Sequence, residues 1–505
     1  MKTARFVADT SFTVGEVDPR LFGGFIEHLG RAIYGGIYEP DHPTADDKGF
    51  RGDVLDIVRR LGTPIVRYPG GNFVSGYNWE DGVGPVNQRP ARLDLAWKTT
   101  EPNLFGTNEF VDWARAAGSE VMMAVNLGTR GIEAASNLVE YCNHPGGSYW
   151  SDLRAAHGYG DPHGIRSWCL GNEMDGPWQI GQKTAVEYGR LASEAAKAMR
   201  LVDPDIDLVA CGSSYPGMPT FPAWEETVLD HLYDQVDFIS LHIYLRDQGN
   251  LGEFLAQPVE MERYIQTVVA ACDLARAKKR SNKTLMLSFD EWNVWYHARA
   301  RDAAIMRESP WQIAPPLTEE SYNLADAVVL GLMIITLLRH ADRVRIACIA
   351  QLVNALSPIM TVTGGPVWLQ STFFPFLHAS QFARGTSLIL VGDAPQLQSS
   401  PYGNVPALEL AATFDSDRQE GVVFAVNRSL DEPMVVNLHT RGFEGMRLVE
   451  QIELTGPDPW AANSPDQPNQ VFPSNATTAS WDGTTLEAPL APLSWSVFRF
   501  SEIGN

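Results

Sequence analysis

Cysteine is scarce in this sequence. The 505 residues include five cysteines and no C-x-x-C pair: Cys142, Cys169, Cys211, Cys272 and Cys348. An odd number of scattered cysteines does not form a disulfide framework and is typical of proteins kept in a reducing compartment. The first residues, MKTARFVADTSFTVGE, also lack the apolar stretch of about 7–15 residues that marks a secretory signal. We therefore expect a cytoplasmic protein.

Long hydrophobic runs are also missing. The longest, Ala327–Leu338, is shorter than the roughly 20 residues that a membrane-spanning helix needs. Thr318 is a suitable N-cap residue, and Glu319 and Glu320 suit the first turn of a helix. We predict a buried helix that starts after Thr318, and no membrane partner.

Positive charge is under-represented. The chain has 39 Lys and Arg against 61 Asp and Glu, which gives a formal net charge of -22. Such a charge repels phosphate backbones and anionic lipid surfaces, whereas neutral substrates meet no such barrier. We therefore expect no nucleic-acid partner.

Motifs for metals and cofactors are missing as well. The sequence has no H-E-x-x-H, no EF-hand loop and no cluster of Cys and His, so we expect no metal site. It has no G-x-S-x-G elbow and no G-x-x-x-x-G-K-[ST] loop. The glycines of PGGN (69–72) do not open a helix and therefore form no phosphate cradle. We expect no cofactor.

The sequence does contain a regular series of strand-like apolar segments between residues 20 and 352. They lie at 21–28, 63–71, 119–128, 164–173, 207–214, 236–244, 284–292 and 345–352. Helical patterns separate them, for example at 110–118, 185–202 and 261–280. Near-continuous apolar strands alternating with helices predict a (β/α)₈ barrel. A doubly wound sheet is the alternative, but no G-x-G-x-x-G follows the first strand.

After residue 385 the helical periodicity disappears. Short alternating segments follow at 407–415, 421–429, 433–440, 447–454 and 494–501. This pattern predicts an antiparallel β-sandwich. The strand-like N-terminus is expected to join it. We thus expect a barrel domain over residues 18–385 and a sandwich domain made of 1–17 plus 386–505.

Polar residues stand at the end of every predicted barrel strand. They are Glu27, His28, Arg67, Asn72, Asn126, Asn172, Glu173, Ser213, Ser214, His242, Tyr244, Asp290, Glu291, Asn293 and Gln351. Active sites of such barrels lie at the C-terminal ends of the strands. These side chains are therefore predicted to meet at one edge.

Two of these residues, Glu173 and Glu291, each close an otherwise apolar strand. A buried carboxylate without a partner is costly, and two that face each other across a pocket are the groups that glycoside hydrolysis uses. One carboxyl group protonates the leaving oxygen, and the other attacks the anomeric carbon or activates water. The alternative is that each Glu forms a structural ion pair. Each has an Asn and a Trp within five residues, which favours the catalytic interpretation.

The neighbours of these glutamates fit the same chemistry. Asn172 is expected to donate to a sugar hydroxyl beside the anomeric carbon, and Tyr244 to donate its O–H to the nucleophilic carboxylate. Arg67 either holds a carboxylate ionised or forms a plain structural ion pair. His28 and His242 are expected to be core histidines. Aromatic faces that could stack on sugar rings come from Trp97, Trp178, Trp292 and Trp295, although a single Trp is more often core.

Five longer segments resemble glycoside hydrolase family 51, the α-L-arabinofuranosidases. They are GGFIEHLGRAIYGGIYEP (23–40), VRYPGGNFVSGYNWEDGVGP (66–85), WKTTEPNLFGTNEF (97–110), WCLGNEMDGPWQIGQK (168–183) and SFDEWNVWY (288–296). They run in the family's order over most of the barrel. The N-E and D-E-W elements alone indicate only the wider clan.

The resemblance implies a retaining exo-arabinofuranosidase acting on arabinose-containing oligosaccharides. Glu173 corresponds to the acid/base and Glu291 to the nucleophile. The residues that correspond to the family's sugar pocket are Glu27, Arg67, Asn72, Trp97, Asn172, Tyr244 and Gln351. The resemblance also implies a C-terminal jelly-roll and a homo-oligomer, by analogy a hexamer. The segment 297–316 is expected to diverge and to shape the leaving-group side.

Other functions stay open at this point. A retaining endo-glucanase or xylanase of the same clan would use the same pair of carboxylates, and so would a transglycosylating enzyme. A non-catalytic carbohydrate-binding protein is the alternative from another class. The preferred linkage (1,2, 1,3 or 1,5), the substrate length and the tolerance of doubly substituted xylose depend on loop shapes that the sequence does not reveal.

Overall fold

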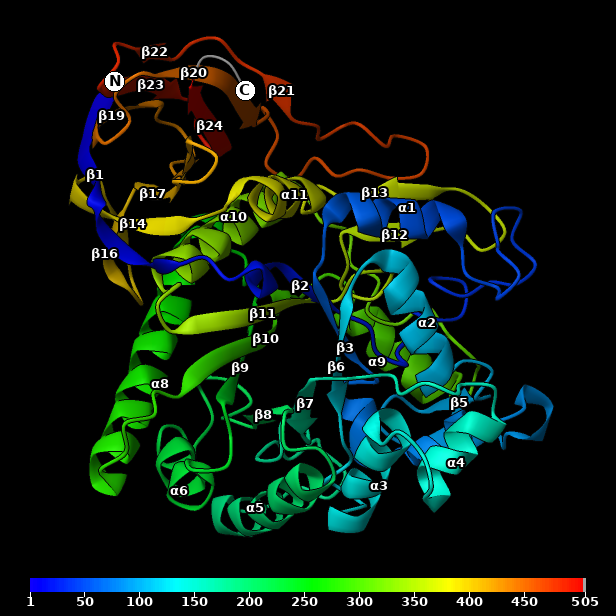
Figure 1. Ribbon diagram of the computed structural model, residues 1–505. Helices are drawn as coiled ribbons and strands as arrows, with labels where there is room; N and C mark the ends of the chain where they lie inside the picture. The colour runs from blue at the N-terminus through cyan, green and yellow to red at the C-terminus, as the bar shows by residue number, and fades with distance from the viewer. Residues whose placement is uncertain (503–505) are drawn as a thin grey trace.

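A closed barrel of eight parallel strands forms the centre of the larger part of the molecule (Figure 1), as a computed structural model of residues 1–502 shows. Around the barrel the strands are β2 (Gly23–Phe25), β3 (Ile65–Tyr68), β6 (Glu120–Ala124), β7 (Ser167–Leu170), β8 (Asp207–Ala210), β9 (Phe238–Leu245), β10 (Met286–Val294) and β11 (Val344–Ala350). Each predicted apolar segment overlaps one of them. Because β11 pairs with β2, the barrel closes and the doubly wound sheet is excluded.

Helices follow the strands and cover the outside of the barrel (Figure 1). They are α1 (Gly52–Leu61), α2 (Thr107–Ala117), α3 (Ile132–Asn143), α4 (Tyr149–Ala156), α5 (Ala185–Val202), α6 (Ala223–Leu232), α7 (Leu251–Ala256), α8 (Pro258–Lys279), α9 (Arg299–Glu308), α10 (Leu324–Arg339) and α11 (Phe373–Phe382). Helix α5 shows how the sequence sets a helix start. Thr184 and Glu187 form a capping box, in which each side chain bonds the other residue's backbone N–H.

Helix α10 contains the long apolar run, and all of its residues from Leu324 to Leu338 are buried. The predicted N-cap at Thr318 is wrong. Asn323 caps the helix instead, and its Oδ1 accepts the N–H of Asp326 at 3.0 Å. A cap must stand directly before the first helical residue, whereas Thr318 lies in a turn with a φ of 54°. Within residues 1–502, no helix is long and apolar enough to cross a membrane.

A second sheet of ten strands lies beside the barrel and curls over its own buried core (Figure 1). Its strands in spatial order are β21 (Ser474–Asn475), β20 (Met446–Leu454), β24 (Ser494–Glu502), β18 (Glu420–Asn427), β17 (Leu408–Asp415), β14 (Thr386–Asp393), β1 (Lys2–Glu16), β19 (Met434–Arg441), β23 (Thr485–Leu490) and β22 (Ser480–Trp481). All neighbours are antiparallel except β1 and β19, which are parallel. The first strand of the chain is therefore an inner strand of the C-terminal sheet.

Three two-stranded hairpins lie outside the two large sheets in residues 1–502. They are β4 (Arg92–Asp94) with β5 (Thr99–Glu101), β12 (Ile359–Thr361) with β13 (Val367–Leu369), and β15 (Gln396–Ser399) with β16 (Gly403–Pro406). The hairpin of β4 and β5 has a direct bearing on the site, because the turn between its strands carries Trp97.

Helix α10 joins the barrel to the curled sheet (Figure 1). Gly331, in the middle of this helix, lies against the ring of Trp495 in β24, and an added Cβ would be 2.6 Å from that ring. A glycine inside a helix costs about 1 kcal/mol relative to alanine, so this close approach explains its presence. One continuous apolar core runs from the barrel exterior through α10 to Trp495 and Val497 of the sheet.

Candidate active site

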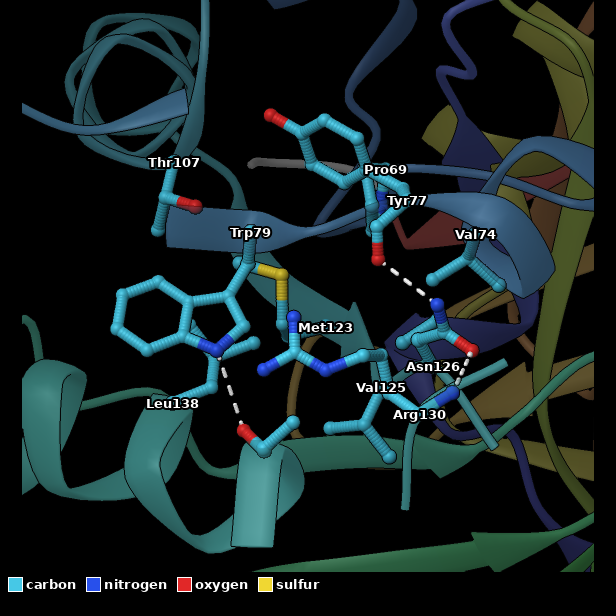
Figure 2. Close-up of a pocket in the computed structure, with 12 residues that line it drawn as sticks. Pro69, Val74, Tyr77, Trp79, Thr107, Met123, Val125, Asn126, Arg130 and Leu138 are labelled. Carbon is cyan, nitrogen blue, oxygen red and sulfur yellow. Dashed lines mark hydrogen bonds between the residues drawn. The ribbon is translucent and has the colours of Figure 1, made fainter. Parts of the chain in front are cut away.

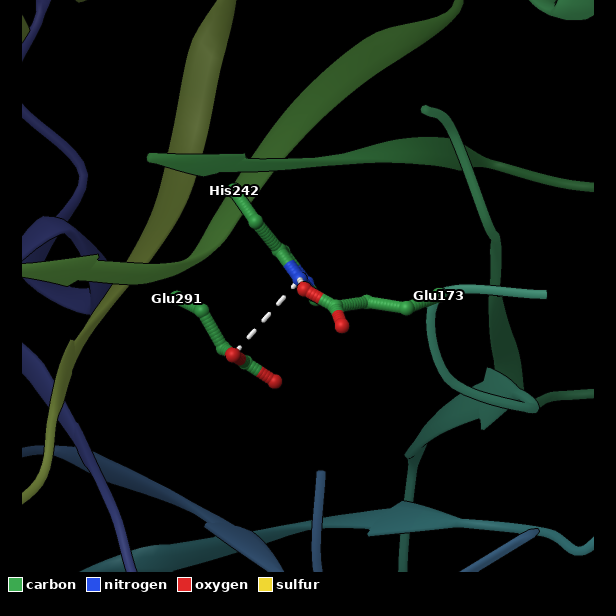
Figure 3. A group of neighbouring side chains, drawn as sticks. All are labelled: Glu173, His242 and Glu291. Atoms are coloured by element: carbon green, nitrogen blue, oxygen red, sulfur yellow. Dashed lines mark hydrogen bonds and ion pairs between the residues drawn. The ribbon is translucent and has the colours of Figure 1, made fainter. Parts of the chain in front are cut away.

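Two carboxylates meet at the C-terminal edge of the barrel (Figure 3). Glu173 follows β7 and Glu291 lies in β10, and their residues are 9% and 5% exposed. One carboxylate oxygen from each of them and a ring nitrogen of His242 lie within 4.8 Å of one another. Carboxyl groups about 5–5.5 Å apart suit double displacement, whereas inversion needs about 6.5–9.5 Å to admit water. The close approach of one oxygen from each group fits the shorter of these two separations.

The backbone at Glu173 has an unusual conformation. Its φ of 46° lies in the left-handed region, directly after Gly171 at a φ of 90° and Asn172. A non-glycine residue there costs about 1–3 kcal/mol and persists when its surroundings fix it. The indole of Trp178 donates to Oε2 of Glu173 at 2.6 Å, and the peptide N–H of Gly176 donates to its carbonyl oxygen at 2.8 Å. This sharp turn directs the side chain across the barrel mouth.

The carboxylate of Glu291 accepts hydrogen bonds on both oxygens. Nη1 of Arg67 donates to Oε1 at 2.6 Å, and the hydroxyl of Tyr244 donates to Oε2 at 2.9 Å. Burial and the charges of Glu291 and Glu173 raise the pKa of Tyr244 well above its usual value, so Tyr244 keeps its proton. These two donors fix the orientation of the Glu291 carboxylate. An oriented carboxylate is what a nucleophile requires.

His242 on β9 lies between the two carboxylates. Its Nδ1 is 2.9 Å from Oε1 of Glu173 and 3.6 Å from Oε2 of Glu291, and its Nε2 is 3.1 Å from Oδ1 of Asp290. Burial by itself lowers the pKa of His242. The charge of Glu291 and the hydrogen bonds with Asp290 and Glu173 outweigh burial and raise the pKa to about 10. Both ring nitrogens therefore carry protons at neutral pH.

Glu27 stands at the end of β2 in a second cluster of the site. Its Oε1 accepts from the indole of Trp97 at 3.0 Å and from the backbone of Phe73 at 2.9 Å. Oε2 faces Nε2 of Gln351 at 3.3 Å. Burial, assisted by the nearby charge of Glu291, raises the pKa of Glu27 to about 8. This carboxyl group is thus neutral at pH 7, which leaves it an O–H to donate.

The trio Glu173, His242 and Glu291 has the composition of a metal site, but its protons do not fit one. A histidine must present an unprotonated nitrogen to a metal ion. Both nitrogens of His242 already face carboxylate oxygens, and Arg67 places a guanidinium 2.6 Å from Glu291. The cluster is held together by hydrogen bonds and ion pairs among its own side chains.

Comparison with known proteins gives the same family over nearly the whole chain. Family models described as "Alpha-L-arabinofuranosidase 1 domain" and "Alpha-L-arabinofuranosidase C-terminal domain" match residues 57–254 and 290–494. A curated relative from Halalkalibacterium halodurans, described as an intracellular exo-alpha-(1->5)-L-arabinofuranosidase, is 56% identical over 501 residues and covers 99% of both chains. This chain belongs to glycoside hydrolase family 51, the α-L-arabinofuranosidases.

Two further relatives come from Bifidobacterium longum. One, described as an exo-alpha-(1->6)-L-arabinofuranosidase, is 46% identical over 512 residues, which covers 98% of this chain and 97% of the relative. The other is a solved family 51 α-L-arabinofuranosidase with a TM-score of 0.94 and 45% identity, and it covers 98% of this chain and 99% of that one. The family 51 fold of this chain, a barrel with a second β-domain, is thus shown by structure as well as sequence.

The structure connects the nine residues that the family 51 resemblance selects. Glu27, Trp97 and Gln351 form one cluster, and Arg67, Asn172, Tyr244 and Glu291 form another. Asn72 reaches Glu173 through Gln179, whose amide nitrogen donates to Asn72 and lies 3.4 Å from Oε2 of Glu173.

Sequence reasoning placed His242 and Asp290 at the barrel edge without a role in this family 51 site, and it missed Gln179. His242 was expected to be a core residue. The signal for it was its spacing from Tyr244, because alternate residues of a strand share a face. Asp290 and Glu291 are consecutive, yet both contact His242. A register shift in β10 between Ser288 and Glu291 allows this, and no sequence pattern marks it.

Other strand-end residues do not meet the carboxylates. Oδ1 of Asn126 accepts the backbone N–H of Gly128 at 2.9 Å, and Nδ2 donates to the carbonyl of Tyr77 at 2.8 Å. A hollow beside Asn126, between β3, β6 and α3, is lined mainly by apolar side chains (Figure 2). Ser213 and Ser214 donate to the buried carboxylates of Glu225 and Asp175. These polar ends fix loops and are separate from the chemistry.

Proposed function

We propose that this chain is an exo-acting, retaining α-L-arabinofuranosidase, with Glu291 as its nucleophile and Glu173 as its acid/base. The single observation that carries the proposal is the proximity of these two carboxylates at the barrel mouth, within 4.8 Å. The two groups have different partners. Glu291 is held by Arg67 and Tyr244. Glu173 accepts from His242 and Trp178.

In the first step, an oxygen of Glu291 attacks the anomeric carbon of the arabinofuranosyl group. The bond from that carbon to the leaving oxygen breaks, and Glu173 gives its proton to this oxygen. Tyr244 and Arg67 keep the Glu291 carboxylate in the attacking orientation. The result is a glycosyl ester on Glu291, a free aglycone and an ionised Glu173.

In the second step, Glu173 removes a proton from water, and the water oxygen attacks the anomeric carbon. The ester bond to Glu291 breaks, which restores both carboxyl groups to their initial states. Two displacements at one carbon return the original anomeric configuration. The same residues serve transglycosylation when a sugar hydroxyl replaces water.

The remaining pocket residues are assigned to binding of one arabinofuranosyl ring. The neutral carboxyl group of Glu27 and the amide of Asn172 donate to sugar hydroxyls, and Trp97 forms a wall through its bond to Glu27. Gly71 lets the chain lie against Glu27, since an added Cβ would be 2.7 Å from a carboxylate oxygen. A side chain at Gly71 would fill the space beside Glu27.

The descriptions of the relatives name different linkages: (1->5) for the Halalkalibacterium relative and (1->6) for one Bifidobacterium relative. The higher identity of the former supports terminal (1→5)-linked arabinofuranosyl groups as substrates of this chain. Its description as intracellular also supports the expected cytoplasmic location. A homo-hexamer stays a prediction, which light scattering after size-exclusion chromatography tests.

The division into domains is likewise our proposal. We assign residues 18–385 to the barrel and residues 1–17 plus 386–505 to the second domain, of which 503–505 lie outside the described residues. The support is the pairing of β1 with both β14 and β19. No separate function is proposed for the second domain.

Proton NMR of the products from arabino-oligosaccharides with (1→2), (1→3), (1→5) and (1→6) linkages tests the function. We expect free arabinose, released first in the anomeric configuration of the substrate, and the fastest release from (1→5) linkages. Release of the opposite anomer would contradict the mechanism. Shortening of xylan or cellulose without release of arabinose would instead support the endo-acting alternative.

A further inference from the structure

His242 lies among polar groups from four strands of the barrel. Glu173 after β7, Asp290 and Glu291 from β10, and Ser240 on β9 face its ring nitrogens. Cys169 from β7, Arg67 from β3 and Tyr244 on β9 contact these acidic neighbours in turn. The imidazole side chain is 3% exposed. A charge at this position interacts strongly with neighbouring charges, because little solvent screens it.

The hydrogen bonds around His242 determine its protonation. An ionised carboxylate only accepts hydrogen bonds, so a nitrogen that bonds to one must donate a proton. Asp290 is ionised, because Arg67, His242 and Ser240 lower its pKa against the effect of burial. Nε2 of His242 therefore donates to Asp290. Nδ1 lies 2.9 Å from Oε1 of Glu173 and 3.6 Å from Oε2 of Glu291, and it also carries a proton because these neighbours raise the pKa of His242 to about 10. A histidine with two N–H donors is an imidazolium.

The reaction moves one negative charge from one side of this imidazolium to the other. Before attack the charge is on Glu291, whose Oε2 lies 3.6 Å from Nδ1 of His242. After attack Glu291 is a neutral ester, and the charge is on Glu173, whose Oε1 lies 2.9 Å from the same nitrogen. At both stages the imidazolium therefore faces one negatively charged glutamate, first Glu291 and then Glu173.

We propose that His242 stays an imidazolium throughout the reaction and links the ionisation of Glu173 to the state of Glu291. This inference rests on the proposed double displacement. In step one the bond from Glu291 to the anomeric carbon forms, the bond to the leaving oxygen breaks, and the proton of Glu173 moves to that oxygen. His242 keeps both protons. In step two, water replaces the leaving group and every transfer reverses.

The coupling assigns different roles to Asp290 and His242. Asp290 is a positioning residue, because its permanent negative charge keeps His242 charged while Glu291 and Glu173 alternate. While Glu291 carries the negative charge, Nδ1 of the imidazolium faces both that carboxylate and the protonated carboxyl group of Glu173. Once Glu291 is esterified, the imidazolium favours ionised Glu173, which is the form that accepts a proton from water.

Two neutral substitutions separate this role from a structural one. In His242→Asn the amide nitrogen replaces Nδ1, and in His242→Gln it replaces Nε2, so each keeps one donor and loses the charge. An opposite charge at this distance shifts a carboxyl ionisation by about 1–3 pH units. We expect both variants to move the alkaline limb of kcat/KM upward by about 1–3 pH units. His439→Asn, in β19 of the curled sheet, is the matched control and leaves the limb unchanged.

Activated aryl arabinofuranosides test the second step, because their departure needs no proton. The acid limb of kcat then reports the ionisation of Glu173 in the glycosyl-enzyme, and it should also move upward. A loss of activity at all pH values without movement of either limb overturns the proposal in favour of a structural role. Thermal unfolding of each variant verifies that the fold is retained.

Nitrogen NMR of the wild-type protein provides a measurement that needs no catalysis. With ¹⁵N-labelled histidine, and His242→Asn to assign the signals, both ring nitrogens of His242 should stay protonated up to about pH 9, given a pKa of about 10. One unprotonated nitrogen at pH 7 overturns the proposal. If the nitrogens are protonated but arabinofuranosides are not cleaved, the proposed function fails and the charged state of His242 stands.

Discussion

Arg67 donates a hydrogen bond from Nη2 to Oδ1 of Asn172 at 2.7 Å. A guanidinium has no acceptor, so this contact fixes which end of the Asn172 amide points toward it. The other end, Nδ2, is buried and has no hydrogen-bond partner among the described residues. An unsatisfied buried donor costs about 1–3 kcal/mol, and a sugar hydroxyl beside the anomeric carbon would satisfy it.

Replacing Asn172 with alanine tests this interpretation. We expect kcat to fall about 10²–10³-fold with a smaller change in KM, because the bond to the sugar tightens in the transition state. A substrate without the hydroxyl next to the anomeric carbon should lose much less on the same substitution. Equal losses on both substrates would show that Asn172 acts only through the fold.

Glu291→Ala should nearly abolish turnover. The variant has no atom to form the glycosyl ester, and loss of a nucleophile costs on the order of 10⁴–10⁶-fold in kcat. Steady-state release of an aryl arabinofuranoside measures the effect. Glu194→Gln on the exposed face of α5 is a control that keeps wild-type rates. Activity within tenfold of wild type would remove Glu291 from the mechanism.

Glu173→Ala should depend on the leaving group. Proton donation is worth about 10²–10⁴-fold, so natural oligosaccharides should lose that factor in kcat/KM. An aryl substrate with an acidic phenol needs no proton and should lose far less. Comparing the two substrates in the same variant checks the role. Equal damage to both would contradict the assignment of Glu173 as the acid.

Glu27→Gln should change how stability depends on pH. The pKa of Glu27 is about 8 in the folded protein against an ordinary 4.5, so folding binds its proton more tightly. The stability that this group contributes is complete below pH 4.5 and is lost as the pH rises to about 8.

The variant carries no such proton. Its free energy of unfolding relative to wild type should therefore rise between these pH values, by a few kcal/mol at roughly 1.4 kcal/mol per pH unit. Chemical denaturation at several pH values measures the difference. A constant difference from pH 4 to pH 8 would show that Glu27 is ionised in the folded protein.

Gly128→Ala should destabilise the loops around the site. An added Cβ at Gly128 would lie 2.5 Å from the carbonyl oxygen of Ser75 and would also collide with the carbonyl of Ile180, and neither backbone group can rotate away. Overpacking of this kind costs about 1–3 kcal/mol. Gly160→Ala is a matched control, because nothing lies within 4 Å of its added Cβ. Equal unfolding midpoints for the two variants would contradict the close contact.

The capped start of α10 shows a limit of local patterns. Thr318 and its glutamates carry the composition of a helix start, yet Glu320 instead accepts the backbone N–H groups of Tyr296, His297 and Ala298. These groups begin the loop after β10. An acidic residue before a helix either stabilises the helix start or binds the backbone of another loop, and the two cases look alike in sequence. Only the position of the preceding strand decides between them.

The sequence alone determined the barrel and its two glutamates. Apolar periodicity reports whether a segment is covered on both faces, and a polar residue that ends such a segment must lie at the barrel edge. The tertiary structure decided which of those edge residues contact one another. Arg67 and Glu291 are 224 residues apart, and His242 and Glu173 are 69 apart, so their contacts depend on closure of the barrel and on the register shift in β10. Hydrogen bonding across that distance leaves no periodic signature in a single chain, which is why the charged histidine between the carboxylates was not foreseen.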